Sequence, residues 1–147
     1  MRALRILAAA ALALALSVMC LTVLADGRAR YVVIVHPSNP ATRLERAFLE
    51  EAFLKKTSRW PDEQVIKPVD LAPDSPVRVA FSEEVVRRSV QAVKVYWQQK
   101  IFSGRDVPPP EFDHDDEVIA YVLKHPGAVA YVAADSNLRG AKPVAVQ

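Results

Sequence analysis

"DLAPDSPVRVAF", residues 70–81, is the stretch that indicates the fold. It completes the strand-like segment Val65–Leu71, crosses a polar turn and begins a helix at Ser75 and Pro76. Serine is a favoured N-cap residue, and proline suits the first helical position. A strand that leads into a helix N-terminus presents free N–H groups to an anion, and Arg78 adds further donors for an oxyanion. The alternative is an ordinary capped helix with a surface arginine.

Similar strand patterns occur on both sides of this stretch. Apolar, β-branched residues run through Arg30–Pro37 and Ala128–Ala134, and a shorter run covers Lys142–Val146. Such runs are typical of buried strands. Pro68 marks the strand Val65–Leu71 as an edge strand or the site of a bulge, because proline has no N–H for a central ladder.

Helix patterns alternate with these strands. One helix is predicted to begin at Ser38–Pro40, where a cap precedes proline, and to end near Lys55. The acidic run Asp113–Glu117 predicts another helix start, and His-Pro-Gly at residues 125–127 predicts its end. This alternation indicates one α/β domain, for which we expect a mainly parallel sheet of three to five strands with flanking helices.

The helix that begins at Ser75 has a continuous apolar stripe and is predicted to extend to Gly104. A break near Arg88 is the alternative, since Ser89 can cap a second helix. The stripe is expected to be buried and consists of Val79, Val86, Val90, Val93, Trp97 and Ile101.

Residues 1–25 have the pattern of a secretory signal peptide. Arg2 and Arg5 form a basic start, an apolar run follows, and "VLA" at residues 23–25 suits signal peptidase. Cleavage there would leave residues 26–147 as a single exported, periplasmic domain of 122 residues. The alternative is that the apolar run stays uncut as a membrane anchor, for which it is long enough.

The chain has one cysteine, Cys20, which lies inside the predicted signal. It is a candidate lipidation site, but Met19 is larger than the small residue expected before a lipidated cysteine. If the signal is removed, the mature domain has no disulfide and no thiol chemistry. An exported domain without disulfides must be stabilised by its core, and 122 residues are enough to bury one.

Charge argues against a nucleic-acid partner. The segment 1–25 contains two of the 19 basic residues and no acid, so the remainder has 17 basic and 17 acidic residues. A formal net charge of zero lacks the basic excess that nucleic-acid binding requires. The sequence also has no "GxSxG", no "HExxH" and no glycine-rich phosphate loop, so we predict no enzymatic activity and no cofactor.

The histidines and tryptophans are weaker candidates. His114 lies among acids, but one histidine at this spacing matches no standard zinc pattern, so we predict a solvated helix start and no metal site. His36 follows the first strand, where α/β ligands often bind, although packing at the strand end is favoured. Trp60 is expected to pack against the sheet edge from its turn, and Trp97 is expected in the core.

Five segments together resemble the short phosphate-type substrate-binding proteins of ABC transporters, within the type 2 periplasmic binding-protein superfamily. The "WPD" turn, the "YW" to "FSG" spacing and the late "PGAVAYV" are the most distinctive parts. In order, the segments are "VVIVHPSNP" (32–40), "LEEAFLKKTSRWPDEQVIKPVD" (49–70), "SPVRVAF" (75–81), "VYWQQKIFSGRDVPPP" (95–110) and "VIAYVLKHPGAVAYV" (118–132).

The resemblance implies that the helix at Ser75 corresponds to the family's phosphate-loop helix, which reads like "GSGTR". Ser75 and Arg78 match that pattern, whereas Asp74, Pro76 and Val77 depart from it. Asp74 adds a negative charge, Pro76 removes an N–H and Val77 lacks a hydroxyl. The family's members have two lobes around a ligand cleft, and 122 residues suffice for about one lobe.

We therefore predict a non-catalytic binding module for a small, phosphate-like oxyanion. Its ligand shelf is expected to combine two helix starts, Ser38 and Asn39 from one and Ser75 with Arg78 from the other. The alternative hypothesis is an accessory lobe that has lost its ligand and binds a protein. The partner would then be a transporter, another envelope protein or a second copy in a homodimer.

Overall fold

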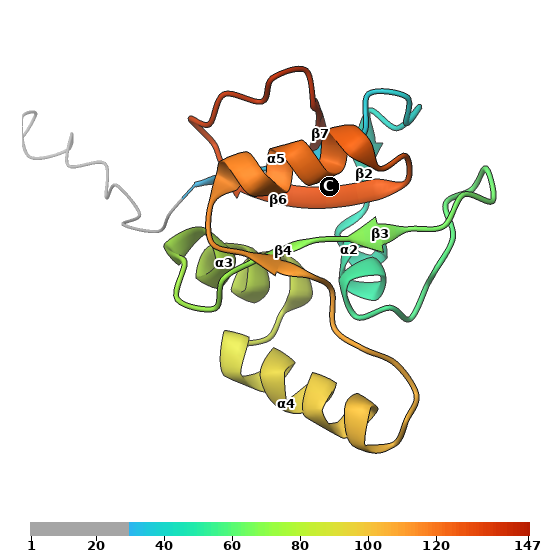
Figure 1. Cartoon of the computed structure of the whole chain (residues 1–147), viewed down its shortest axis with the longest axis vertical. Helices are drawn as coiled ribbons and strands as arrows, with labels where there is room; N and C mark the ends of the chain where they lie inside the picture. The colour runs from blue at the N-terminus through green and yellow to red at the C-terminus, as the bar shows by residue number, and fades with distance from the viewer. Residues whose placement is uncertain (1–29) are drawn as a thin grey trace, which may run out of the picture.

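The computed structural model describes residues 30–147, so the predicted signal peptide and Cys20 lie outside the described residues. No helix in this described range is both long and apolar enough to cross a membrane. In chain order the elements are β1 (Tyr31–Val35), β2 (Arg43–Leu44), α2 (Arg46–Phe53), β3 (Lys67–Pro68), β4 (Asp70–Leu71), α3 (Pro76–Phe81), the π-helical turn η2 (Ser82–Val86), α4 (Val90–Phe102), β5 (Glu111–Phe112), α5 (Asp115–Lys124), β6 (Ala128–Ala133) and β7 (Lys142–Val146) (Figure 1).

A five-stranded sheet with the order β2-β7-β1-β6-β3 forms the centre of the domain. β1 runs antiparallel to both of its neighbours, β6 and β7. Only the outer pairs, β2 with β7 and β3 with β6, are parallel. The predicted α/β domain and strand number are confirmed, but the sheet is mixed rather than mainly parallel. The direction of β1 is set by pairing with the last third of the chain, which no local pattern reveals.

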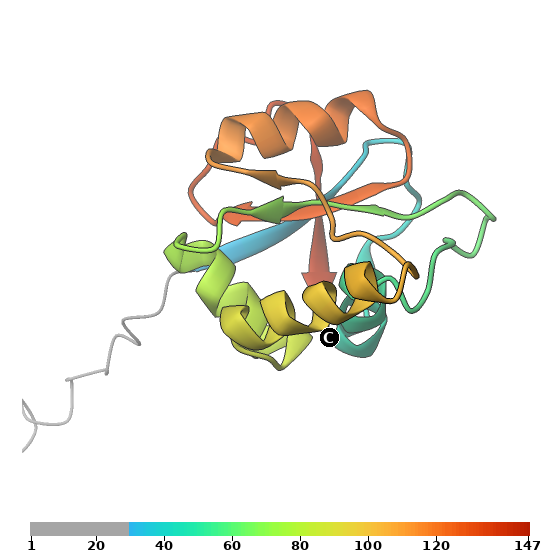
Figure 2. The same ribbon diagram turned by 60° about the horizontal axis from the view of Figure 1, so that its bottom comes forward.

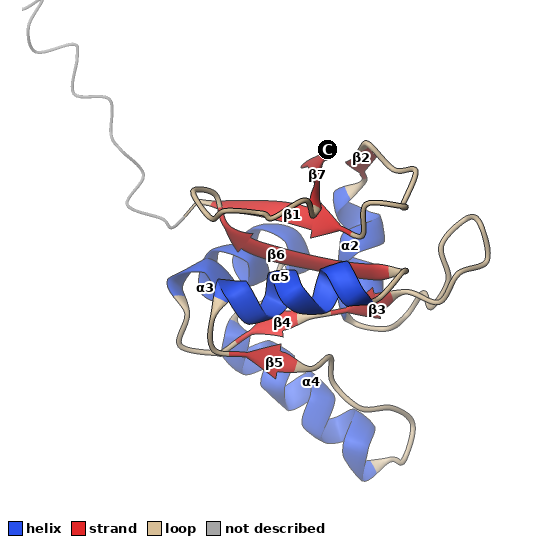
Figure 3. Ribbon diagram, turned by 45° about the horizontal axis from the view of Figure 1, so that its top comes forward, coloured by secondary structure: helices blue, strands red, loops and turns tan. Residues whose placement is uncertain are grey.

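Helices cover both faces of this sheet. Figure 2 shows α5 on one side and α2, α3 and α4 on the other. β4 leaves the main sheet and pairs in parallel with β5, beside which α4 extends away from the body (Figure 3). Pro68 lies in β3, an edge strand, as proline requires. The core lies between the layers and includes Ile34, Leu49, Phe81, Val85, Ile119 and Tyr131.

The first predicted helix begins later than expected. Pro37 and Ser38 form a turn that the Asn39 N–H closes by donating to the His36 carbonyl, β2 follows, and α2 starts only at Arg46. The backbone of Thr42 and Leu44 accepts hydrogen bonds from Ala145 and Gln147 of the C-terminal strand region. This pairing with a segment about a hundred residues away holds the chain extended where local capping signals predict a helix.

The helix predicted from Ser75 to Gly104 is broken near Arg88, which is the alternative that the cap at Ser89 suggested. Arg87 adopts φ 57° after η2, and the Ser89 hydroxyl accepts the Ala92 N–H at 3.1 Å to cap α4. The break turns the two parts of the apolar stripe to different faces. Val86, Val93 and Trp97 are buried as predicted, Val90 is half-buried, and Val79 and Ile101 are exposed.

Candidate functional site

Arg78 is buried and does not project from the surface. The Ser75 hydroxyl caps α3 by accepting the Arg78 N–H at 3.4 Å, and this places the arginine at the inner side of the helix. Only 4% of Arg78 is exposed. Its Nη1 donates to the Leu71 carbonyl at 3.0 Å and lies 2.8 Å from an Asp70 carboxylate oxygen. β4 and the helix that follows it are therefore joined by a buried ion pair.

Asp70 is the centre of a buried polar network. The Tyr131 hydroxyl donates to Asp70 Oδ1 at 2.8 Å and accepts the Leu71 N–H at 3.3 Å. Burial raises the pKa of the Asp70 carboxyl to about 6, although Arg78 and the Tyr131 hydroxyl both lower it. Burial and the Asp70 charge raise the pKa of Tyr131 well above its ordinary value, so this hydroxyl remains a donor.

Arg78 also borders a hollow of about 430 Å³ between α4 and the strand β5, which we call the Arg78 hollow. Lys94, Gln91 and Gln98 line it from α4, and Glu111 lines it from β5. The Glu111 carboxylate lies 3.7 Å from Arg78 Nη1 and its side chain is 42% exposed. The hollow thus combines two cations, Arg78 and Lys94, with one partly exposed acid, Glu111, while Asp70 lies behind Arg78.

The predicted shelf of two helix starts does not form. Ser38 and Asn39 follow the end of β1, beside the beginning of β6. β3 runs parallel to β6, and β4 continues in the same direction. Ser75, which follows β4, therefore lies beside the far end of β6. Because β1 is antiparallel to β6, the two pairs of residues lie at opposite ends of the sheet (Figure 1). A role in ligand binding stays a prediction for each pair separately.

Local contacts account for the residues around Ser38 and for the other candidates. The Ser38 hydroxyl lies 2.7 Å from His36 Nδ1, so both side chains are engaged in the turn after β1. His114 precedes α5, where its N–H donates to Glu117 at 3.2 Å. The described residues contain no group of three or more acidic, histidine or cysteine side chains that could hold a metal ion.

Sequence reasoning missed the acids that accompany Arg78. Asp70 was visible as one acid at the end of an apolar strand, eight positions before the arginine, and that signal favours a buried pair. Tyr131 and Glu111 carried no such signal, because each is brought to Arg78 by a separate strand.

No protein-family model matches the sequence, and no curated protein matches it by sequence. Solved structures do match the fold. An ABC-type phosphate transport receptor from Vibrio cholerae superposes with TM-score 0.61 at 17% identity, over 80% of this chain and 46% of the receptor. A phosphate ABC transporter substrate-binding protein with bound phosphate, from Clostridium perfringens, gives TM-score 0.62 at 18% identity, over 80% of this chain and 45% of that protein.

PstS from Borrelia burgdorferi gives TM-score 0.62 at 11% identity, over 81% of this chain and 47% of that protein. The chain thus spans less than half the length of each of these three structures. It has the fold of one lobe of a phosphate-type ABC transporter substrate-binding protein, which confirms the fold that the sequence resemblance predicted.

Proposed function

We propose that this chain is a non-catalytic binding module that recognises a small oxyanion in the Arg78 hollow. The observation that carries the proposal is a buried guanidinium, anchored by Asp70 and the Leu71 carbonyl, at the border of a 430 Å³ hollow that also contains Lys94. A fixed guanidinium binds oxyanions well because little side-chain freedom is lost. The fold shared with phosphate-binding receptors supports the same ligand class.

Local electrostatics set the expected strength of binding. Asp70 and Glu111 offset the positive charges of Arg78 and Lys94, so an incoming anion competes with Glu111 for the guanidinium. Glu111 is half-exposed and can turn away into solvent. We therefore expect weak binding that improves when either acid is neutralised.

Isothermal titration of residues 26–147 with phosphate and sulfate tests the proposal. Lys94→Gln should weaken binding, whereas Asp70→Asn and Glu111→Gln should strengthen it by removing negative charge. Lys124→Gln, an exposed lysine on α5 across the sheet, is the matched control and should change nothing. The oxyanion proposal fails if neither the wild type nor Glu111→Gln binds either anion at millimolar concentration.

An accessory lobe that binds another protein is the second candidate. It is favoured by exposed apolar side chains at the end of α4 and in the loop that follows it, where Ile101 lines the hollow: Phe102 is 95% exposed, Val107 61% and Ile101 53%. Exposed apolar clusters of this kind often mark a protein interface. Light scattering would detect a homodimer, and crosslinking in the native envelope would detect a transporter or another envelope protein. A strict monomer without crosslinked partners would contradict this candidate.

The signal pattern supports export to the periplasm, the compartment in which such a module would meet its ligand. Mass spectrometry of the periplasmic fraction should then identify a chain that begins at Asp26. A chain that retains Met1, or that is lipidated at Cys20, would contradict cleavage after Ala25.

A further inference from the structure

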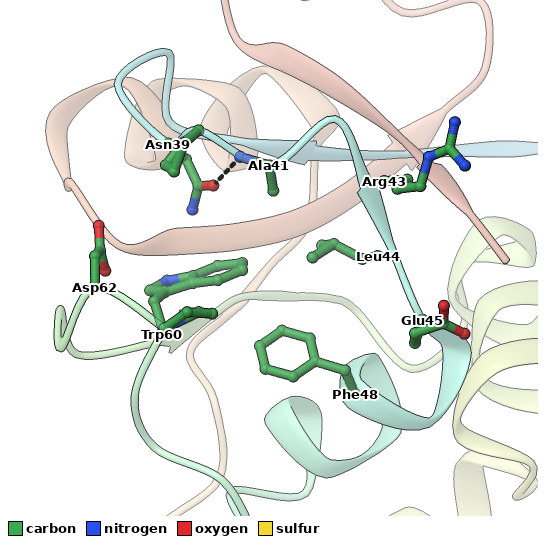
Figure 4. Close-up of a pocket in the computed structure, with 10 residues that line it drawn as sticks. Asn39, Ala41, Arg43, Leu44, Glu45, Phe48, Trp60 and Asp62 are labelled. Atoms are coloured by element: carbon green, nitrogen blue, oxygen red, sulfur yellow. Dashed lines mark hydrogen bonds between the residues drawn. The ribbon is translucent and has the colours of Figure 1, made fainter.

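A second and larger pocket lies at the opposite end of the sheet from Arg78. Its volume is about 630 Å³, and we call it the Trp60 pocket. Its apolar floor consists of Leu44, Phe48 and Trp60, with Ala41 at the wall (Figure 4). The volume lies within the range of sites that bind small organic ligands.

Trp60 is held rigidly in this pocket. Its Nε1 donates to the Gly127 carbonyl at 2.9 Å, and its ring packs against Phe48 with centroids 5.3 Å apart. The residue is only 4% exposed, so the ring forms a fixed apolar surface. A preformed surface of this kind binds apolar groups without an ordering cost.

Asn39 supplies a hydrogen-bond donor to the same pocket. The residue is 5% exposed, and its Oδ1 accepts the Ala41 N–H at 2.9 Å, which fixes the orientation of the amide. The amide nitrogen then points into the pocket, as Figure 4 shows, and has no protein partner in the part of the chain that the structure describes. A donor that is fixed in this way and open to the pocket favours a ligand that brings an acceptor.

Asp62 supplies an acceptor at the same end of the pocket (Figure 4). One carboxylate oxygen accepts the Gln64 N–H at 3.2 Å, and the side chain is otherwise exposed. Asn39 and Asp62 therefore offer an N–H donor and an oxygen acceptor beside an apolar floor. A carboxamide carries the complementary pair, a carbonyl oxygen and an N–H, in one group.

We propose that the Trp60 pocket binds peptide-type ligands, with an apolar side chain on Trp60, Phe48 and Leu44 and the adjoining amide between Asn39 and Asp62. The site is independent of the oxyanion proposal, because it uses none of the residues of the Arg78 hollow.

The test is an NMR titration of residues 26–147 with N-acetyl-L-leucinamide and, separately, with N-acetylglycinamide. The leucine derivative should bind with millimolar affinity and shift the backbone amide signals of Asn39, residues 41–45, Trp60 and Asp62. The glycine derivative lacks the apolar group and should bind at least tenfold more weakly. A capped tripeptide with a central leucine should bind more tightly than N-acetyl-L-leucinamide if the pocket prefers a peptide segment to a single residue.

Two variants test the two halves of the site. Asn39→Asp keeps the acceptor for the Ala41 N–H but replaces the donor by a carboxylate, so leucinamide affinity should fall at least tenfold. Ala41→Phe fills the pocket and should abolish binding even if Asn39→Asp perturbs the fold. Asp135→Asn, an exposed change at the far end of the sheet, is the control. Absence of shifts at these residues, or leucinamide affinity that is unchanged in a folded Asn39→Asp protein, would overturn the proposal.

Discussion

Asp70 matters both for stability and for the proposed ligand binding, because it is buried and pairs with Arg78. It is buried with Arg78 and accepts a hydrogen bond from Tyr131, yet burial raises its pKa to about 6. Removing a carboxylate from water therefore costs more than these two partners return. The neutral form of Asp70 is the better-tolerated one in the folded protein.

Asp70→Asn is expected to be at least as stable as the wild type at pH 7. The folded pKa of about 6 lies above the ordinary value of 3.8, so the folded state binds this proton more tightly than the unfolded chain. The stabilisation from Asp70 is complete below about pH 4 and is lost as the pH rises through 6. The Asp70→Asn protein keeps this stabilisation at every pH. Its free energy of unfolding should therefore exceed that of the wild type by up to about 3 kcal/mol at pH 7.

Urea denaturation of both proteins between pH 4 and pH 7.5 measures this difference. The two curves should converge at low pH and separate as the pH rises. Asp74→Asn, at an exposed position, is the control for a change of one charge. A variant that is much less stable than wild type at pH 7 would show that the ion pair with Arg78 outweighs the burial of the carboxylate.

At the scale of elements, the turn before β6 holds several segments together. Gly127 has φ +88°, and a Cβ there would clash with the Val65 carbonyl oxygen. Its own carbonyl accepts both the Trp60 Nε1–H and the Lys67 N–H. The end of α5, the Trp60 turn and β3 therefore depend on one residue without a side chain.

Gly127→Ala should destabilise the protein by more than about 2 kcal/mol, because backbone strain and a clash with fixed backbone add. Gly104→Ala is the matched control, since Gly104 also has positive φ but nothing lies within 4 Å of an added Cβ. Thermal denaturation should rank Gly127→Ala well below Gly104→Ala. Equal losses would mean that the turn moves to make room for the methyl group.

For the molecule as a whole, we expect α4 to unfold together with the sheet and the other helices. α4 extends away from the sheet, but Trp97 and Val93 are buried and the Tyr96 hydroxyl donates to the Leu54 carbonyl at 2.8 Å. These contacts tie α4 to the residue that follows α2. We expect the described domain to unfold as one cooperative unit.

The two tryptophans lie in different parts of the fold and can report separately. Trp60→Phe leaves fluorescence from α4, and Trp97→Phe leaves fluorescence from the turn beside the sheet. In each variant, the fluorescence transition in urea should coincide with the loss of circular dichroism. A fluorescence transition at lower urea in Trp60→Phe alone would show that α4 opens independently.

Local signals in the sequence were enough to predict several of the helices and strands. The strands at β1, β6 and β7, the cap at Ser75 and the start of α5 were predicted, and the break before Ser89 was the stated alternative to a continuous helix, because propensity and capping depend on neighbouring residues. The order of the five segments, "VVIVHPSNP" to "VIAYVLKHPGAVAYV", also indicated the lobe fold that the solved structures confirm.

The directions of the strands and the surroundings of the candidate residues could be seen only in the folded structure. Because β1 pairs antiparallel with β6, Asn39 lies far from Ser75 and lines the Trp60 pocket. Packing of β4 against Tyr131 and Glu111 turned Arg78 from a surface donor into a buried partner of Asp70. Both outcomes depend on contacts between residues far apart in the chain, whose free energy no local pattern encodes.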